Sequence, residues 1–377
     1  MIKPEKTIGI VGNGQLGRMS CIEAKKMGYT VLIYGPGKNS PGGQVADVEI
    51  DGDYTDLNSL SDFAKRCDVI TFEFENIPSL SLEKIKEITP IHPDPSVIQI
   101  AQNRISEKNW FLNNGFPTTP FFEITSSGNL ENAMNKWNSK AVLKTSMFGY
   151  DGKGQIKISS AEESESAWYS LKTNSAILEK WVEFTHELSV IVARNESGEI
   201  KTYPVFENSH RNHILDVTVF PGRFSESVAK QARDIAEELA EKIGLIGLLT
   251  IEMFLTNSGE LLINELAPRP HNSGHVTFDV CMTSQFQQHI RAVCNLPLGN
   301  TDPLQKGIMI NILGDSWVEG EPGWKKLLEI EGLNLHLYGK SDPKPARKMG
   351  HITITGGDLF EKGNFARQIL KIPSEIQ

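Results

Sequence analysis

The stretch LLTIEMFLTNSGELLINELA, residues 248–267, decides the fold class. Two apolar runs flank the turn residues TNSGE, which is the pattern of an antiparallel β-hairpin. If Asn257 and Glu260 close a four-residue turn, the register places Glu252 directly opposite Glu265. Facing side chains on paired strands lie about 4.5–5.5 Å apart, where two like charges destabilise the sheet unless a cation neutralises them.

The two carboxylates of this hairpin therefore predict a cation site. Oxygen ligands from Glu252 and Glu265, with Asn264 beside them, suit Mg2+ better than zinc, and nucleotide phosphates would complete the shell. The alternative is that one of the two glutamates points to solvent. Both lie in otherwise apolar strands, which favours the metal interpretation.

Outward from the hairpin, the chain divides into three predicted domains, as its 377 residues allow. Short β-branched runs alternate with helical stretches from Thr7 to about Pro95, which predicts a βαβ parallel sheet. Strands separated by glycine-rich turns, with a long helix over 225–243, predict an α+β domain after it. Short late strands predict a small β-rich domain at the end. The expected domains are 1–100, 101–296 and 297–377.

Composition restricts the class of protein. The chain carries 47 acidic and 38 basic residues, a formal net charge of -9, whereas a nucleic-acid binder usually needs a basic face. No apolar run reaches the ~18–20 residues of a membrane span, and no apolar leader precedes the first strand. The 4 cysteines are scattered without a CxxC pair, which suggests neither a disulfide framework nor a zinc site. We therefore expect a cytoplasmic protein without nucleic-acid or membrane partners.

Gly12, Gly14 and Gly17 form a GxGxxG pattern between the first strand and the first helix. A dinucleotide site would also need an Asp or Glu about 20 residues later, and the region YGPGKN has none. We therefore predict that Gln15, Leu16 and the start of the helix hold another anionic ligand. Binding of NAD stays open as an alternative.

Lys144 ends the strand AVLK and precedes a glycine-rich turn with the sequence TSMFGYDGKGQ. Gly149, Gly152 and Gly154 would leave this turn flexible, while Lys144, Lys153 and backbone N–H groups suit phosphate oxygens. A mobile flap over phosphates is one interpretation, and a solvated β-hairpin is the other. The GxxxxGK[ST] pattern of a P-loop does not occur here.

The segment NELAPRPHNSGH continues from the second strand of the hairpin. His271 and His275 are four residues apart, but Pro268 and Pro270 favour a loop over a zinc-binding helix. The loop is predicted to contact a substrate through Arg269, His271 and Asn272.

Five motifs, GNGQLGRM, VITFEFENI, GYDGKGQ, NELAPRPHNSGH and RKMGH, follow one another over nearly the whole chain. Together they resemble the N5-carboxyaminoimidazole ribonucleotide synthases of the ATP-grasp superfamily. The resemblance implies an ATP-grasp fold, α/β and α+β, with an N-terminal βαβ domain and a small β-rich C-terminal domain. It also implies a ligase that uses ATP, bicarbonate and Mg2+ to carboxylate 5-aminoimidazole ribonucleotide, and a homodimer.

The same resemblance implies roles for individual residues. The ATP-binding residues would be Arg104, Lys144, Gly149, Tyr150, Asp151, Gly152, Lys153, Gly154, Gln155, Glu179, Lys180, Trp181, Val182, Glu187, His210, Asn264 and Glu265. The ribonucleotide would contact Gln15, Leu16, Glu73, His271, Asn272, Arg347 and Lys348, although Arg347 and Lys348 alone are typical of a solvated surface pair. Tyr150, Asp151, Lys153 and Arg269 would be catalytic, and Glu252 and Glu265 would bind the metal. The family often has a basic residue where this chain has Ser146, so a role that depends on a second basic residue is not expected there, while the loop itself is.

Three alternatives remain open on the residues alone. Another ATP-grasp ligase could act on a different acceptor, and an oxidoreductase would take the GxGxxG pattern as an NAD site. The third alternative is a nucleotide-binding regulator without catalysis, against which the carboxylate pair and the loop lysines weigh.

Overall fold

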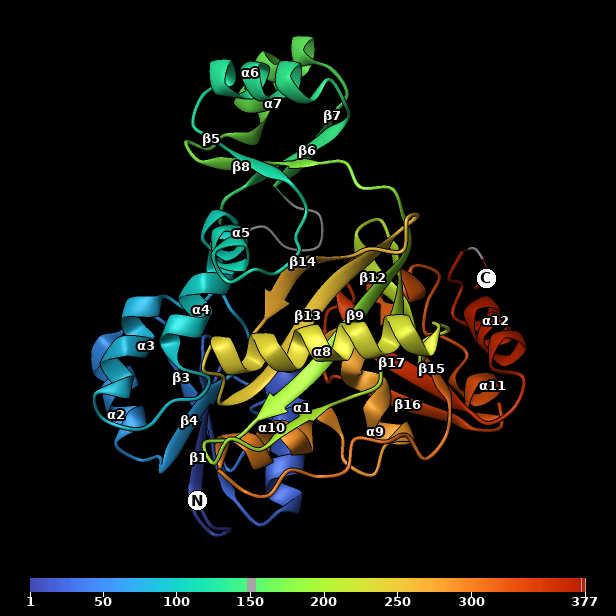
Figure 1. The fold of residues 1–377 in the computed structure, drawn as a ribbon. Helices are drawn as coiled ribbons and strands as arrows, with labels where there is room; N and C mark the ends of the chain where they lie inside the picture. The colour runs from blue at the N-terminus through green and yellow to red at the C-terminus, as the bar shows by residue number, and fades with distance from the viewer. Residues whose placement is uncertain (148–153, 374, 377) are drawn as a thin grey trace.

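The computed structural model describes residues 1–147, 154–373, 375 and 376 of the chain. Figure 1 shows three groups of elements: a small lobe at the top, a lobe of short strands and helices at the lower left, and a body built on one large sheet. Within the described residues, none of the helices is both long and apolar enough to cross a membrane.

The N-terminal lobe contains the predicted parallel sheet, with strand order β3-β2-β1-β4. Its interior is apolar, as the β-branched runs predicted, and residues such as Ile8, Val31 and Ile70 are fully buried. The elements are β1 (Thr7–Val11), α1 (Gln15–Lys26), β2 (Thr30–Gly35), β3 (Val48–Asp51), α2 (Leu57–Ala64), β4 (Val69–Phe72), α3 (Ser79–Lys86) and α4 (Pro95–Gln102).

The small lobe is an antiparallel sheet of four strands in the order β5-β8-β6-β7, with two helices packed on one face (Figure 1). Helix α5 (Arg104–Asn113) leads into it, and the side chain of Asn103 caps that helix by accepting from the backbone N–H of Ile105 at 3.0 Å. The lobe comprises β5 (Phe121–Ile124), α6 (Ser127–Trp137), β6 (Ala141–Thr145), β7 (Gln155–Ile158), η1 (Ala161–Glu163), α7 (Ser164–Leu171) and β8 (Ala176–Lys180).

The large sheet has nine strands, eight of them in the order β14-β13-β9-β11-β12-β15-β17-β16, with β10 paired to β9. Its strands are β9 (Phe184–Arg194), β10 (Ile200–Thr202), β11 (Phe206–Arg211), β12 (Ile214–Phe220), β13 (Gly247–Thr256), β14 (Leu261–Ala267), β15 (Gly307–Leu313), β16 (Leu333–Leu337) and β17 (Lys348–Thr355). The helices that accompany it are α8 (Glu226–Lys242), η2 (Asn272–Val276), α9 (Thr277–Val280), α10 (Gln285–Val293), η3 (Gly314–Trp317), α11 (Trp324–Leu328) and α12 (Leu359–Ile369). The late strands extend the sheet of the preceding region, so one sheet runs across the predicted boundary at residue 297. The domain limits stay predictions.

The hairpin of β13 and β14 confirms the pairing of Glu252 with Glu265 but not the predicted turn. The backbone N–H of Thr256 donates to the carbonyl of Glu260 at 2.9 Å, so these two residues close the turn rather than Asn257 and Glu260. A β-bulge then leaves Asn264 without a cross-strand partner and restores the predicted register at the glutamates. The turn prediction was therefore wrong by one residue, and the bulge offsets the difference.

Candidate active site

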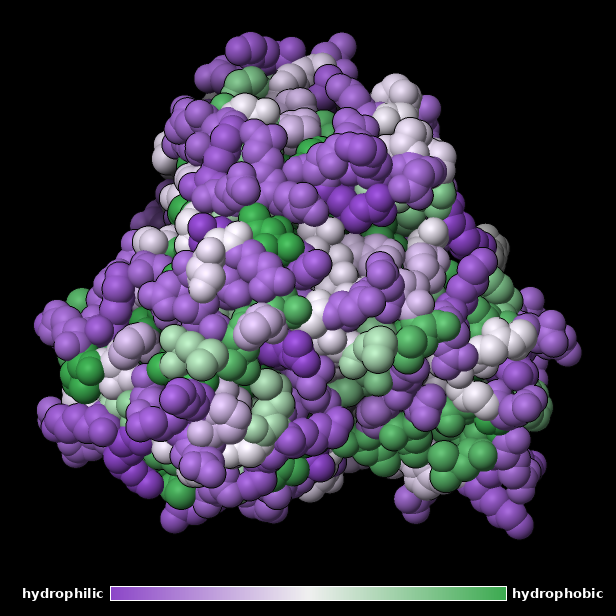
Figure 2. Space-filling model, turned by 60° about the horizontal axis from the view of Figure 1, so that its bottom comes forward, coloured by the Kyte–Doolittle hydropathy of each residue, from purple (hydrophilic) through white to green (hydrophobic). Residues whose placement is uncertain are grey.

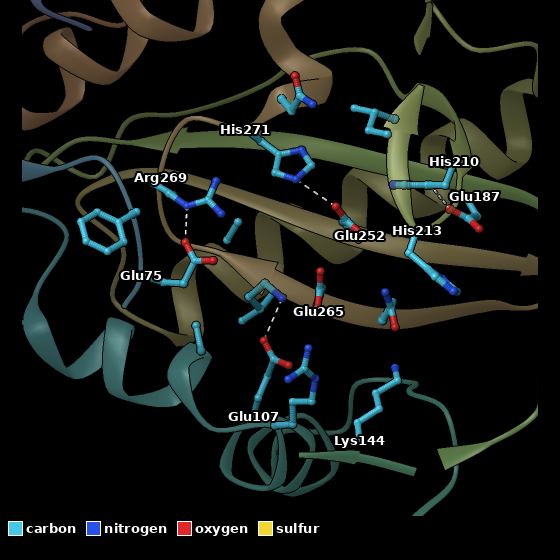
Figure 3. A pocket seen from close by; sticks show the side chains of 18 of the residues that line it. Glu75, Glu107, Lys144, Glu187, His210, His213, Glu252, Glu265, Arg269 and His271 are labelled. Atoms are coloured by element: carbon cyan, nitrogen blue, oxygen red, sulfur yellow. Dashed lines mark hydrogen bonds and ion pairs between the residues drawn. The ribbon is translucent and has the colours of Figure 1, made fainter. Parts of the chain in front are cut away.

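A cavity of about 1040 Å3 is lined by residues from all three groups of elements. Its walls come from the small sheet, the large sheet, helix α5, the N-terminal lobe and the loop after β14. Figure 3 shows Lys144 at one side, Glu252 and Glu265 from neighbouring strands in the middle, and the Arg269–Glu75 pair on the opposite side. The cavity is thus lined by charged groups along its whole length.

A buried group of charges lies behind Lys144, at the end of the cavity beneath the small lobe. Glu179 is only 4% exposed and lies between two lysines: Lys144 Nζ at 2.6 Å from Oε2, and Lys108 Nζ at 3.9 Å from Oε1. Burial alone would raise the pKa of Glu179, but the two lysines lower it to about 2. Lys108 is buried as well and donates to Thr118 Oγ1 at 2.9 Å. The ionised Glu179 therefore orients the lysine that the sequence predicted as a phosphate ligand.

Aromatic and polar side chains continue this end of the cavity. Trp181 lies under the Lys157 ammonium, which is 3.9 Å from the ring centroid, and Phe184 stacks on Phe254 with centroids 4.7 Å apart. His210 forms an ion pair with Glu187. Burial alone would lower the pKa of His210, but the Glu187 carboxylate raises it above its ordinary value. Flat apolar faces beside paired polar groups suit the base and sugar of a nucleotide.

Glu252 and Glu265 face each other at the centre of the cavity, as Figure 3 shows. His271 Nε2 lies 2.9 Å from Glu252 Oε1, and this contact lowers the pKa of Glu252 to about 2 against the effect of burial. Desolvation between the walls of the cavity, with the neighbouring Glu252 charge after it, raises the pKa of Glu265. Two facing carboxylates, next to the bulged Asn264, offer oxygen donors that could hold a hard divalent cation.

Helix α5 contributes charged residues from one face to the same centre. Glu107 accepts from the backbone N–H of Leu266 at 2.8 Å, which ties the helix to β14. Burial and the adjacent Glu265 raise the pKa of Glu107 to about 8. Arg104, three residues earlier, also lines the cavity, and its side chain donates to the carbonyl of Thr145 at 3.3 Å.

The loop after β14 is anchored to the N-terminal lobe by a partly buried ion pair. Arg269 pairs with Glu75, and its Nη1 donates to the carbonyl of Pro270 at 3.0 Å. Burial alone would raise the pKa of Glu75, but the Arg269 guanidinium lowers it to about 2. Within the described residues, the buried side-chain amide of Asn272 has no hydrogen-bond partner, although Asn272 lines the cavity. An unpaired amide at a cavity wall fits a ligand contact.

The glycine-rich turn before α1 holds a carboxylate of the protein itself. Backbone N–H groups of Gly14 and Gly17 donate to Glu73, the second at 2.6 Å. A Cβ at Gly14 would lie 2.6 Å from Glu73 Oε1, so the close approach of this carboxylate depends on glycine there. The sequence predicted an external anion at this helix end, and the anion that the glycine N–H groups hold is instead Glu73. The same contact fills the place where a dinucleotide pyrophosphate would bind.

A basic group that sequence analysis missed lies beside Glu73. Lys340 follows β16, donates to the carbonyl of Lys348 at 2.7 Å, and interacts electrostatically with Glu73 and Arg347. Burial and the neighbouring Arg347 lower the pKa of Lys340 to about 8. Its only sequence signal was a lysine eight residues before Lys348 in the same β-rich segment. These three basic residues, of which Lys348 lines the cavity, suit a phosphate group.

The structure brings most of the predicted site residues to the cavity wall. Those that line it are Gln15, Leu16, Glu73, Arg104, Lys144, Gln155, Trp181, Glu187, His210, Glu252, Asn264, Glu265, Arg269, His271, Asn272 and Lys348. Five described residues are not among those that line it: Gly154, Glu179, Lys180, Val182 and Arg347. Arg347 instead donates to the carbonyl of Asp342 at 2.7 Å. Gly149, Tyr150, Asp151, Gly152 and Lys153 lie outside the described residues.

A second group of candidate metal ligands, Asp279, His336 and His351, has a different geometry. The imidazole rings of His336 and His351 are stacked, with centroids 4.5 Å apart and planes within 11°. The lone pairs of stacked rings lie in parallel planes and cannot converge on one ion as tetrahedral ligation requires. His336 Nε2 instead lies 2.9 Å from Asp279 Oδ2. This group is a hydrogen-bonded, stacked part of the interior.

Comparison with known proteins decides the family. Models of a ribonucleotide synthetase preATP-grasp domain, an ATP-grasp domain and a phosphoribosylaminoimidazole carboxylase C-terminal domain match residues 5–102, 109–286 and 307–362. N5-carboxyaminoimidazole ribonucleotide synthase of Bacillus subtilis is 47% identical over 356 residues, which cover 94% of this chain and 92% of that protein. The chain belongs to the N5-carboxyaminoimidazole ribonucleotide synthases.

Other members of this synthase family agree in sequence and fold. The synthase of Brucella melitensis is 40% identical over 93% of this chain and 97% of its own length. A crystal structure of an ADP complex of such a synthetase superposes with a TM-score of 0.93 at 44% identity, covering 99% of this chain and 98% of that one. The synthase of Aspergillus clavatus, solved with ADP and 5-aminoimidazole ribonucleotide, has a TM-score of 0.90 at 28% identity and covers 98% of each chain. The chain is therefore an ATP-grasp ligase by family, with the predicted fold confirmed.

Proposed function

We propose that this chain catalyses the ATP- and bicarbonate-dependent carboxylation of 5-aminoimidazole ribonucleotide to N5-carboxyaminoimidazole ribonucleotide, a step of purine biosynthesis. The observation that carries the proposal is the order of groups along one cavity. The carboxylates of Glu252 and Glu265 lie between a side that contains Lys144 and a side that contains the Arg269–Glu75 pair (Figure 3), and Glu73 is an electrostatic neighbour of Arg269. A nucleotide on the first side and a sugar phosphate on the second would meet at the carboxylates.

ATP would bind between the small and the large sheet. Residues 179–182 would contact the adenine, Glu187 and His210 the ribose, and Arg104 and Lys144 the phosphates. The ion pair of Lys144 with Glu179 supports this assignment, since it holds a cation at the cavity wall before ATP arrives. The turn 149–155 would close over the phosphates and exclude water from the reacting atoms.

A Mg2+ ion is the cation that the central donors fit best. Glu252 and Glu265 supply oxygen ligands, and desolvation, with the neighbouring Glu252 charge after it, raises the pKa of Glu265. Bound there, the ion would offset the charge of the transferring phosphoryl group. The basic residues Arg104, Lys144 and Arg269 would share that task from the walls around it.

The chemistry would proceed through carboxyphosphate. A bicarbonate oxygen attacks the γ-phosphorus of ATP, the bond from that phosphorus to the β–γ bridging oxygen breaks, and ADP leaves. The C–O bond of carboxyphosphate then breaks to give CO2 and phosphate. The exocyclic amine of the ribonucleotide attacks CO2 and passes its proton to the phosphate or to Asp151, which completes the new N–C bond. Tyr150, Lys153 and Arg269 would orient the bicarbonate and its phosphorylated form.

Oxygen isotopes test this sequence of steps. Because the bridging oxygen of carboxyphosphate comes from bicarbonate, 18O-labelled bicarbonate should transfer one label to inorganic phosphate in each turnover. Direct attack of water on ATP would leave the phosphate unlabelled. Phosphate without label, formed at the rate of ADP release, would contradict the carboxyphosphate step.

The ribonucleotide would bind at the end near the N-terminal lobe. Gln15, Leu16 and Glu73 would contact its sugar and base, and Arg347, Lys348 and the newly found Lys340 would surround its phosphate. Replacing Arg347 and Lys348 together by alanine should raise the KM for the ribonucleotide at least tenfold, with little change in the KM for ATP. An unchanged KM would return this pair to the role of solvated surface residues.

A cytoplasmic homodimer is the proposed working form. An apolar area at the lower right of Figure 2 supports an interface, and Met282 and Leu304 are 68% and 67% exposed beside the bridge between Cys281 and Pro303. Multi-angle light scattering should give about twice the 41.9 kDa chain mass. The variants Met282→Lys and Leu304→Lys should reduce that mass to one chain, and a monomeric wild-type protein would contradict the proposal.

A further inference from the structure

His275 lies at the ribonucleotide end of the cavity, and no role follows for it from the predicted motifs or from the proposed chemistry. It lines the cavity although it is only 1% exposed. Its ring lies 5.6 Å from Phe286 and 6.2 Å from Tyr338, centroid to centroid, and these two side chains pack with Leu16. His351 is nearer still, with ring centroids 4.9 Å apart, and His271, His336, Lys348 and Arg269 act on the ring electrostatically. His275 is therefore set among the residues proposed to bind the ribonucleotide.

The buried side chain of Gln285, the first residue of α10, fixes how this histidine carries its proton. Gln285 Oε1 accepts from the backbone N–H of His271 at 2.9 Å, and its Nε2 donates to the carbonyl of His271 at 2.6 Å. A backbone N–H can only donate and a carbonyl can only accept, so the orientation of this amide is determined. The second hydrogen of Nε2 is then directed at His275 Nδ1, 3.2 Å away.

His275 Nδ1 is consequently an acceptor, and the ring proton of the neutral imidazole is on Nε2. A second proton on Nδ1 would face the amide hydrogens of Gln285 and would add charge beside Lys348 and Arg269. Burial, with the His271 charge after it, moves the pKa of His275 well below its ordinary value. Cavity and hydrogen bonds thus make His275 an uncharged donor with a fixed tautomer.

We propose that His275 is a substrate-binding residue whose Nε2–H donates a hydrogen bond to the unsubstituted ring nitrogen of the aminoimidazole base. This inference rests on the proposed function. The cations Lys340, Arg347 and Lys348 suit the phosphate of the ribonucleotide. The ring nitrogen of its base is an uncharged acceptor, and the uncharged Nε2–H of His275 matches it without attracting an anion to that position. The contact would hold the imidazole so that its exocyclic amine faces the central carboxylates.

Two variants with opposite hydrogen-bonding capacity test the contact by steady-state kinetics. His275→Leu removes the donor, and the KM for the ribonucleotide should rise about tenfold, since it leaves a buried acceptor of the substrate unpaired, while the KM for ATP changes less than twofold. His275→Gln places an amide N–H near the position of Nε2 and should restore the KM for the ribonucleotide to within about threefold of wild type. Equal effects of the two substitutions, or no effect of His275→Leu, would overturn the proposal.

A matched control separates this role from the general cost of removing a buried histidine. His289 is fully buried, contacts Thr71 Oγ1 at 2.7 Å and does not line the cavity. His289→Leu should lower the melting midpoint and leave both KM values near wild type. A rise in the ribonucleotide KM in His289→Leu equal to that in His275→Leu would assign the effect to packing and overturn the proposal.

Nitrogen NMR of protein labelled with 15N-histidine tests the tautomer without any loss of stability. One histidine signal should show a protonated Nε2 and a bare Nδ1 throughout pH 6–8, disappear in His275→Gln, and shift when the ribonucleotide is added. A His275 signal that titrates in this range, or that ignores the ribonucleotide, would overturn the proposal. ADP release by wild-type enzyme that is indifferent to the ribonucleotide would overturn the proposed function instead, and the inference with it.

Discussion

Replacing Glu179 by glutamine should destabilise the protein strongly, because the buried carboxylate is the shared partner of Lys108 and Lys144. Its pKa is about 2 in the folded protein against 4.5 when unperturbed. That difference corresponds to roughly 3 kcal/mol of folding stability at pH 7, which the neutral amide cannot supply. For a domain of the size matched over residues 109–286, the melting midpoint should fall by about 6–12 °C.

The pH dependence of this effect gives the sharper test. Because the folded pKa of Glu179 lies below its unfolded value, the stability is present above about pH 4.5 and is lost as the pH falls toward 2. The difference in the free energy of unfolding between wild type and Glu179→Gln should therefore narrow to about 2 kcal/mol at pH 3.5. Differential scanning calorimetry at both pH values measures it, with the exposed Glu131→Gln on α6 as control. A Glu179→Gln midpoint within 2 °C of wild type at pH 7 would refute the reasoning.

Three further predictions concern catalysis. Glu265→Gln should abolish ADP release from Mg-ATP while circular dichroism stays that of wild type, since one of the two predicted metal ligands is lost; wild-type turnover would end the metal assignment. Lys340 has a pKa of about 8, so its charged fraction falls about tenfold from pH 7 to pH 9. The ribonucleotide KM should rise similarly over that range in wild type and stay flat in Lys340→Met, and a pH-independent wild-type KM speaks against this role. Gly14→Ala would place a Cβ 2.6 Å from Glu73 Oε1 and push that carboxylate away, so kinetics should show a raised KM for the ribonucleotide and an unchanged KM for ATP. A ribonucleotide KM equal to that of wild type would show that Glu73 does not take part in substrate binding.

Local patterns predicted the elements that carry the site. Alternation of short strands and helices predicted the parallel sheet, and the hairpin sequence predicted that Glu252 and Glu265 face each other. The predicted turn was wrong by one residue because a bulge at Asn264 shifts the strand register by one. Sequence periodicity gives no signal for where a bulge occurs. The correct pairing of the glutamates thus arose from two deviations that cancel.

Contacts between distant segments could not be predicted in the same way. Glu73 lies 59 residues from Gly14, and only the folded sheet brings its carboxylate to the glycine N–H groups. The same holds for Glu75 with Arg269, 194 residues apart, and for Lys340, whose neighbour Glu73 belongs to another lobe. Residue type identified these positions as polar or charged, while their partners and shifted pKa values depend on the tertiary fold.

The most direct test of the central claim is ADP release from Mg-ATP, measured with and without bicarbonate and with and without 5-aminoimidazole ribonucleotide. The proposed function predicts strong stimulation that requires both bicarbonate and the ribonucleotide, with one N5-carboxyaminoimidazole ribonucleotide formed for each ADP. ADP release that does not respond to the ribonucleotide would contradict the assigned acceptor and direct the search to another amine.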